Sequence, residues 1–172
     1  KVLRLCKKYA EEFGTGENLL FIGGTGLGKT YLSACVANAV AEKGFSVCYE
    51  SAGSLFTKLE KNRFNPDAES ESAVKEFAEC DLLILDDFGM ERQTEYAREQ
   101  VFGVIDGRYL ARKPLIVTTN LSLRELKSPA DMARQRIYDR ILELCVPVCF
   151  DRESLRQEKA RENMKRYLEL TG

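Results

Sequence analysis

The residues with the clearest chemical potential form a glycine-rich stretch at positions 23–30. It reads Gly-Gly-Thr-Gly-Leu-Gly-Lys-Thr and matches the pattern G-x-x-x-x-G-K-[ST] at every fixed position. In this pattern the glycines let backbone N–H groups turn inward around phosphate oxygens. The lysine can reach the β- and γ-phosphates, and the last hydroxyl can ligate Mg²⁺. We therefore predict a phosphate-binding loop (P-loop) that holds ATP or ADP with Mg²⁺ through Gly24, Thr25, Gly26, Leu27, Gly28, Lys29 and Thr30.

The segments on either side supply the strand and the helix that such a loop needs. The apolar run 19–22 predicts a buried strand. Residues 30–43 carry apolar side chains at helical spacing and stop before Gly44, a residue typical of helix ends. The positive end of that helix then faces the phosphates. This strand–loop–helix order favours a nucleotide site over a glycine-rich turn that matches by chance.

A second apolar run ends in two carboxylates. Residues 81–89 read Asp-Leu-Leu-Ile-Leu-Asp-Asp-Phe-Gly, the form of a Walker B segment. A strand that ends at Asp86 would place this acid beside Mg²⁺, whose charge offsets the desolvation of the carboxylate. Asp87 is the candidate to orient or deprotonate an attacking water. Many ATPases of this kind have the longer Glu there, so a nucleotide-dependent switch with negligible turnover is an alternative to an ATPase.

Two polar features lie farther along the chain. The strand predicted at 114–119 runs into Asn120, and the carboxyl ends of parallel strands are where open sheets bind ligands. Asn120 could therefore hold the attacking water together with Asp87. Arg136 and Arg140 are four residues apart and share one face of a predicted helix. They suit either the phosphate of a neighbouring molecule or a plain solvated basic face.

The alternation of apolar strands with helical segments predicts an α/β fold. In such folds a parallel sheet is covered by helices on both faces. The chain of 172 residues fits a single domain over 1–172. Strands are expected at 18–23, 45–50, 81–86, 114–119 and 145–150, and helices at 1–13, 30–43, 53–64, 73–79, 94–111, 122–126, 130–144 and 153–170.

Composition narrows the possible functions. The net charge of −1 means that any contact with nucleic acid must be local. The absence of histidine excludes zinc sites with nitrogen ligands, and none of the six cysteines forms C-x-x-C. These cysteines are expected as small core residues in a reducing cytosol. Without an apolar run long enough to span a bilayer, we predict a cytoplasmic protein that does not act at a membrane.

Taken together, the motifs resemble those of the bacterial replicative-helicase loaders of the DnaC/DnaI type. These loaders belong to the AAA+ ATPases and are close to the IstB-like transposition ATPases. The similarity covers nearly all of 1–160. The phosphate-binding and Walker B motifs are generic to P-loop ATPases, whereas the two segments nearest the carboxyl terminus narrow the choice. The similar segments are 9–13, 23–30, 82–89, 113–121, 136–140 and 150–156.

The resemblance implies an AAA+ five-stranded sheet and a weak ATPase that acts when oligomerised or bound to DNA. It implies assembly into a ring or helical oligomer with ATP, and partnership with a replicative DNA helicase and single-stranded DNA. Asn120 corresponds to sensor 1. Arg140 corresponds to the arginine finger that completes a neighbour's site, and Arg156 to the sensor 2 arginine that contacts nucleotide within the same subunit.

The same resemblance points to a DNA contact on the helix expected over 54–64. In loaders and initiators this region helps to bind single-stranded DNA, which makes Lys61, Arg63 and Phe64 candidates. An aromatic ring can stack on a base while cations meet phosphates, although Phe64 could equally be a packing residue. The helicase-binding region of the family normally precedes the ATPase domain and is expected to be absent from this chain. A transposition helper acting on duplex DNA is the alternative function.

Overall fold

The computed structural model describes residues 1–14, 17–64, 75–89, 94–128, 132–151, 164 and 167, with the side chains of 62–64 and 133 left out. Five strands form one sheet in the order β2-β3-β4-β1-β5, and all neighbouring strands run parallel. This confirms the predicted five-stranded parallel sheet. The strands are β1 Asn18–Ile22, β2 Val47–Ser51, β3 Leu82–Asp86, β4 Leu115–Thr119 and β5 Cys145–Cys149.

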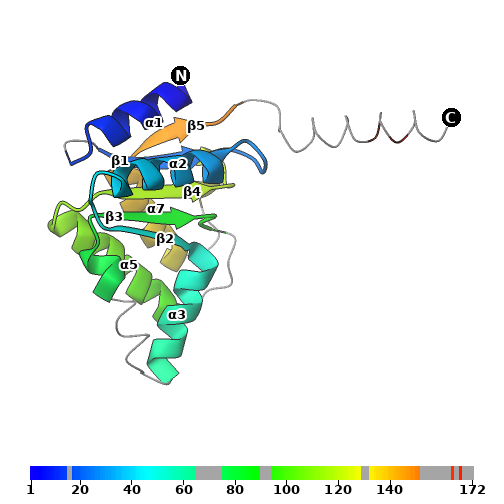
Figure 1. Ribbon diagram of the computed structural model, residues 1–172. Coiled ribbons are helices and arrows are strands. Elements are labelled where there is room, and N and C mark those ends of the chain that lie inside the picture. Colours follow the sequence, from blue (N-terminus) through cyan, green and yellow to red (C-terminus); the bar gives the residue numbers. More distant parts are fainter. Residues whose placement is uncertain are drawn as a thin grey trace.

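Helices cover both faces of this sheet, as predicted (Figure 1). One face carries α1 (Val2–Glu11) and α2 (Lys29–Ala41). The other carries α3 (Ala52–Phe64), α5 (Glu95–Leu110) and α7 (Met132–Leu144), with the short α6 (Leu123–Lys127) beside α7. The helix predicted at 73–79 is seen over 75–79, and the one predicted at 153–170 lies almost wholly outside the described residues.

Burial on both faces explains why the strands read as unbroken apolar runs. Successive side chains of β1 enter different cores, because side chains alternate along a strand. Leu19 and Phe21 pack with α1 and α2, whereas Leu20 and Ile22 pack on the α3, α5 and α7 side. Strands β3 and β4 are buried along their whole length. The three central strands are therefore firmly held, and their ends are fixed points for the loops that follow.

The strand order sets which loops meet. Because β4 lies between β1 and β3, the carboxyl ends of these three strands are neighbours at one edge of the sheet. We call this edge, with the residues that follow the three strands, the carboxyl edge, and the opposite edge the amino edge. Strand β5 closes one side of the sheet, where Pro147 is exposed and its missing N–H costs no ladder hydrogen bond.

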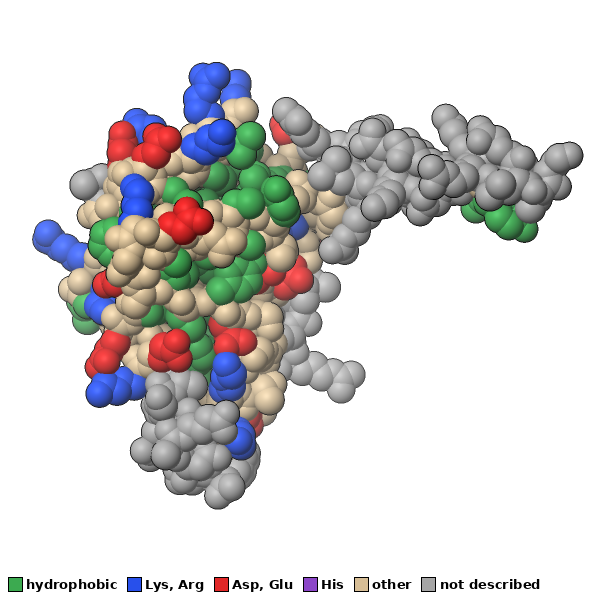
Figure 2. All heavy atoms as spheres, viewed as in Figure 1, with side chains coloured by type: hydrophobic (Ala, Val, Ile, Leu, Met, Phe, Trp, Pro, Cys, Tyr) green, Lys and Arg blue, Asp and Glu red, His purple; other side chains and the backbone are tan. Residues whose placement is uncertain are grey.

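The surface carries charges of both signs. On the face shown in Figure 2, lysine and arginine side chains are interspersed with aspartate and glutamate, in keeping with a net charge of −1. Within the described part of the chain, none of the helices is both long and apolar enough to serve as a membrane span. All six cysteines are free thiols; Cys6, Cys48, Cys80 and Cys145 are buried, as the core interpretation predicts, whereas Cys35 and Cys149 are exposed and do not fit it.

Candidate nucleotide site

The phosphate-binding loop joins β1 to α2 at the carboxyl edge. Gly26 and Gly28 have φ of 83° and 91°, the left-handed region that glycine adopts without strain, and Gly28 is the N-cap of α2. Gly23 is required for a different reason, because a Cβ there would lie 2.6 Å from the carbonyl oxygen of Phe150. The start of the loop therefore packs closely against the residue that follows β5. The loop ends at the first turn of α2, where backbone N–H groups without helical partners can bind an anion.

Lys29 is buried at the base of this loop, with 4% of its surface exposed. Its ammonium donates to the carbonyl oxygens of Gly23 at 2.6 Å and Gly24 at 2.8 Å, and to Asn120 Oδ1 at 2.7 Å. A buried lysine keeps its charge only where acceptors surround it. These contacts hold the cation at the loop and connect it directly to the end of β4.

Asp86, the last residue of β3, is also buried and accepts two hydroxyl hydrogen bonds at Oδ1. Thr118 Oγ1 donates at 2.6 Å and Thr30 Oγ1 at 3.2 Å. The P-loop threonine and the Walker B acid are thus brought together, as a shared Mg²⁺ site requires. Hard cations prefer such oxygen ligands, and Mg²⁺ commonly uses one or two protein groups with substrate phosphates. Among the described residues there is no cluster of three acids or thiols that would form an all-protein metal cage.

Asp87 follows in an unusual backbone conformation, with φ of 55°. The left-handed region is costly for most residues and tolerable for aspartate. Two contacts fix it: its backbone N–H donates to Thr118 Oγ1 at 3.0 Å, and its Oδ1 accepts from Asn120 Nδ2 at 3.1 Å. The turn ends β3 abruptly and leaves the carboxylate exposed at the carboxyl edge, where it can meet a water molecule.

Asn120 therefore lies between the two charged groups that the sequence singled out. Its amide oxygen accepts from the Lys29 ammonium and its amide nitrogen donates to the Asp87 carboxylate. This orientation of the amide is the one that suits both partners, since a cation needs an acceptor and a carboxylate needs a donor. Lys29, Asn120 and Asp87 form one connected chain of hydrogen bonds across the ends of β1, β4 and β3.

Sequence reasoning missed two residues of this site. The Thr118 hydroxyl orients both acids, because it donates to Asp86 and accepts from the Asp87 N–H. The Tyr49 hydroxyl lies 3.0 Å from Ser33 Oγ and donates to the Thr30 carbonyl at 3.4 Å. Burial raises the pKa of Tyr49 to about 12, and the charge of Asp86 adds to this. A hydroxyl residue near the end of an otherwise apolar strand was the available signal for Thr118.

The remaining candidates lie away from this site or outside the described part. Arg140 is on α7, where Nη2 is 2.6 Å from Asp106 Oδ1 and Nη1 is 2.8 Å from Glu143 Oε2. The contact between Arg140 and Glu143 also has hydrogen-bond geometry. Lys61 is exposed on α3. The side chains of Arg63 and Phe64, and the whole of Arg156, are not among the described residues.

Comparison with known proteins now identifies the family. Residues 9–163 match the model of the IstB-like ATP binding protein family. The chain belongs to this family. It is 31% identical over 165 residues to the replicative helicase loader DnaI of Bacillus subtilis, a match that covers 90% of this chain and 52% of that protein.

The fold is that of the AAA+ P-loop ATPases, as predicted. A crystal structure of the DnaC helicase loader superposes with a TM-score of 0.72 at 26% identity, over 87% of this chain and 88% of that one. The replication initiator DnaA bound to AMPPCP and single-stranded DNA gives a TM-score of 0.71 at 23% identity, over 95% of this chain and 50% of that one. The chain spans about half the length of the curated relatives that it matches.

Proposed function

We propose that the chain is the ATPase domain of a cytoplasmic helicase loader, which hydrolyses ATP while it places a replicative DNA helicase on single-stranded DNA. The observation that carries this proposal is the hydrogen-bonded chain from Lys29 through Asn120 to Asp87, with Thr30 and Asp86 paired beside it. Membership of an ATP-binding family supports the nucleotide. Similarity to helicase loaders supports the partner.

In this mechanism the loop 24–30 binds the phosphates of ATP, and Thr30 and Asp86 hold Mg²⁺, which neutralises charge on the phosphates. Asp87 orients or deprotonates the attacking water, and Asn120 fixes the carboxylate that does so. Lys29 reaches the β- and γ-phosphates from the base of the loop. Arg156 contacts the nucleotide within the same subunit, as the family resemblance implies.

A neighbouring copy completes the site. Arg140 lies on α7, whose end leads directly into β5 at the amino edge, where Cys145 pairs with Asn18. The nucleotide loop follows the opposite end of β1. A guanidinium held at the far edge of the sheet serves a second subunit more readily than its own, so we assign Arg140 as an arginine finger in a ring or helical oligomer that forms with ATP.

Single-stranded DNA is assigned to the end of α3. Lys61 is exposed there, and the sequence places Arg63 and Phe64 on the same helix. Stacking of a base on an aromatic ring with nearby cations is a binding mode that tolerates any sequence. Duplex DNA as the substrate would instead indicate a transposition helper, the alternative that the family resemblance includes. A nucleotide switch would bind ATP with little turnover.

Phosphate release, measured across protein concentrations with single-stranded DNA, with duplex DNA of the same sequence, and without DNA, tests these functions. We expect hydrolysis that rises more than linearly with protein concentration and that single-stranded DNA stimulates more than duplex. Lys29→Ala should weaken ATP–Mg²⁺ binding at least about tenfold, since a charged hydrogen bond contributes ~1.5–3 kcal/mol.

Each other result has a definite meaning. Stimulation by duplex alone would favour the transposition helper. Tight ATP binding with no hydrolysis under any condition would favour the switch. Unchanged ATP affinity of the Lys29→Ala protein by calorimetry would exclude the proposed nucleotide site.

A further inference from the structure

The guanidinium of Arg140 is seated between groups of its own subunit. Nη2 lies 2.6 Å from Asp106 Oδ1 on α5, and Nη1 lies 2.8 Å from Glu143 Oε2 on α7. The guanidinium carbon is also 5.3 Å from the ring centre of Tyr109 and 5.9 Å from that of Phe102, both on α5. Carboxylates and aromatic rings therefore fix the position of the side chain.

The two carboxylates are not equivalent. The Asp106 side chain is 28% exposed and belongs to a different helix, whereas the Glu143 side chain is 60% exposed and lies one helical turn from Arg140. Exposed ion pairs within one helix are weak because water and salt screen them. A partly buried pair between two helices is screened less and restricts the arginine more. The Asp106 contact is an ion pair without hydrogen-bond geometry, but because it is less exposed and joins two helices we take Asp106 as the main anchor of Arg140.

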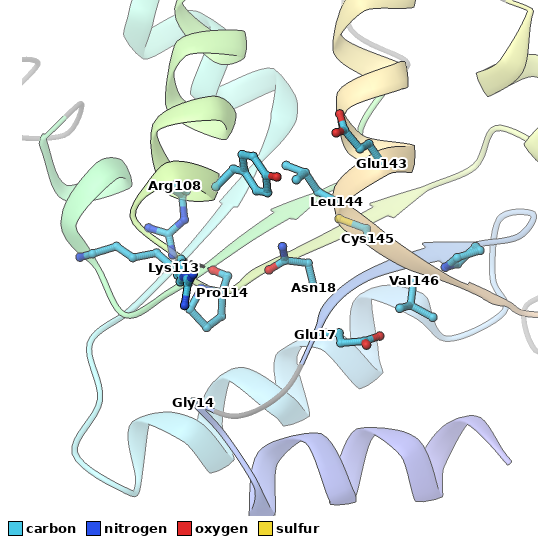
Figure 3. A pocket seen from close by; sticks show the side chains of 13 residues that line it. Gly14, Glu17, Asn18, Arg108, Lys113, Pro114, Glu143, Leu144, Cys145 and Val146 are labelled. Atoms are coloured by element: carbon cyan, nitrogen blue, oxygen red, sulfur yellow. Dashed lines mark hydrogen bonds between the residues drawn. The ribbon is translucent and has the colours of Figure 1, made fainter.

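The contacts leave the arginine able to act on a second molecule. A guanidinium has five N–H donors, and the Asp106 and Glu143 contacts engage only one terminal nitrogen each. A quarter of the Arg140 side chain is exposed. Tyr109 and Glu143, which touch Arg140, also line an open cavity of about 570 Å³ at the amino edge. Figure 3 shows Glu143 there, on the same helix as Leu144 and above Asn18 and Cys145.

We propose that Asp106 is a positioning residue for catalysis in trans: it holds the Arg140 guanidinium in a fixed orientation at the amino edge, ready for the nucleotide of a neighbouring copy. This inference rests on the proposed role of Arg140 as an arginine finger. A free arginine side chain samples many rotamers. Contacts that already hold it in one orientation remove most of this conformational entropy before the subunits associate. The contribution of Asp106 is thus geometric, and the charge that meets the phosphate is that of Arg140.

A mixing experiment separates the two subunits of one interface. The Arg140→Ala protein keeps an intact nucleotide site but lacks the finger, and the Asp87→Asn protein keeps the finger but lacks the base. Each alone should be nearly inactive, and their mixture should recover hydrolysis. Asp106→Asn is then added to one protein at a time. In the Asp87→Asn protein, which lends the finger, it should lower the recovered rate roughly tenfold. In the Arg140→Ala protein it should leave the rate unchanged.

Matched variants distinguish positioning from folding. Glu143→Gln in the finger-lending protein should lower the recovered rate only about twofold, because that pair is exposed. Asp106→Glu keeps the charge and should retain more of the rate than Asp106→Asn. ATP affinity should not change in any of these proteins. If Asp106→Asn lowers the Tm, Asp106→Ser, with a smaller side chain, is placed in each of the two proteins in turn and the recovered rates are compared in the same way.

The outcomes discriminate clearly. Equal loss from both placements of Asp106→Asn would show a structural role and overturn the proposal. If Asp106→Asn in the finger-lending protein raises the recovered rate, Asp106 restrains Arg140 instead of positioning it for catalysis. If the rate does not change, Asp106 has no effect on the finger. Either result overturns the proposal. Failure of the parent mixture to recover hydrolysis would instead reject Arg140 as a finger, and with it the premise of the inference.

Discussion

Charged and polar side chains have different roles at the carboxyl edge and the amino edge of the sheet. At the carboxyl edge Lys29, Asn120 and Asp87 bond to one another across three strands, and Asp87 remains exposed. At the amino edge Arg108 is 1% exposed, and its guanidinium donates to backbone carbonyls. The acceptors are Phe77 at 2.9 Å, Ala78 at 3.4 Å, Cys80 at 3.0 Å, Asp81 at 3.3 Å and Pro114 at 2.6 Å.

The difference teaches where polar groups serve a ligand and where they serve the fold. Arg108 satisfies carbonyls that lead into β3 and β4, groups that would be costly to bury without a donor. Desolvation lowers the pKa of its guanidinium, but the group stays charged because an arginine pKa begins so high. At the carboxyl edge, by contrast, the charged side chains of Lys29 and Asp87 meet at one side chain, that of Asn120. Changes to Arg108 and to the residues of the carboxyl edge should therefore separate stability from function.

The largest expected effect is on chemistry at the carboxyl edge. Asp87→Asn should lower ATP hydrolysis roughly 10²–10⁴-fold, the usual contribution of a general base, because an amide cannot accept the proton of water. ATP binding should be retained. Phosphate release at saturating ATP and calorimetric affinity measure the two quantities separately.

Asp81→Asn is the matched control, since Asp81 and Asp87 flank the same strand β3 at its two ends. It should leave hydrolysis unchanged. A normal rate for the Asp87→Asn protein would mean that the general base lies elsewhere. The carboxyl edge could then no longer be contrasted with the amino edge as the catalytic one.

The next effect is on stability at the amino edge. Arg108→Met should lower the free energy of unfolding by ~3 kcal/mol, because several buried carbonyls lose their donor. Urea denaturation measures this loss, and ATP affinity of the folded protein should stay the same. Arg112 is an exposed arginine that lines the cavity at the amino edge, as Arg108 does. Arg112→Met should therefore change the free energy of unfolding by less than about 0.5 kcal/mol. Equal losses from both variants would show that Arg108 is no special support for β3 and β4.

Local pattern was enough to predict the sheet and to place the candidate nucleotide-site residues at its carboxyl edge. The strands are short apolar runs followed by a glycine, a carboxylate or an amide, so Gly23, Asp86 and Asn120 could be placed at strand ends from spacing alone. Their convergence follows from the order of parallel strands. These features depend on residues close in sequence, which is why the motifs and the fold class agreed with the structure.

Contacts between distant segments could not be predicted in this way. Helical spacing puts Arg108 on the same face as Val101 and Ile105, but it does not reveal the acceptors, which come from about 30 residues earlier and from Pro114 after the helix. The link between Arg140 and Asp106 joins two helices whose mutual angle no local pattern sets. Thr118 read as one more β-branched strand residue, and only the turn at Asp87 shows what its hydroxyl does.

The smallest expected effect is the acid sensitivity of the amino edge. Asp81 Oδ2 accepts hydrogen bonds from Ser46 Oγ at 2.7 Å and Ser46 N at 2.8 Å, and these two bonds, the hydroxyl first, lower the pKa of Asp81. A carboxyl whose pKa is lower in the folded than in the unfolded state stabilises the fold above its ordinary pKa near 4. That contribution is lost as pH falls through the lowered pKa of the folded state.

The stability difference between wild type and Asp81→Asn should therefore be greatest at neutral pH and shrink below about pH 4. Because the group lies near the surface, where solvent screens it, the difference should stay within about 1 kcal/mol. Urea midpoints at pH 7, 5 and 3.5 measure it, since other titrating groups act on both proteins alike and cancel. A difference that stays constant with pH would mean that the Ser46 bonds do not depend on the charge of Asp81. ATP affinity at pH 7 should be the same in both proteins, because this carboxylate serves the amino edge alone.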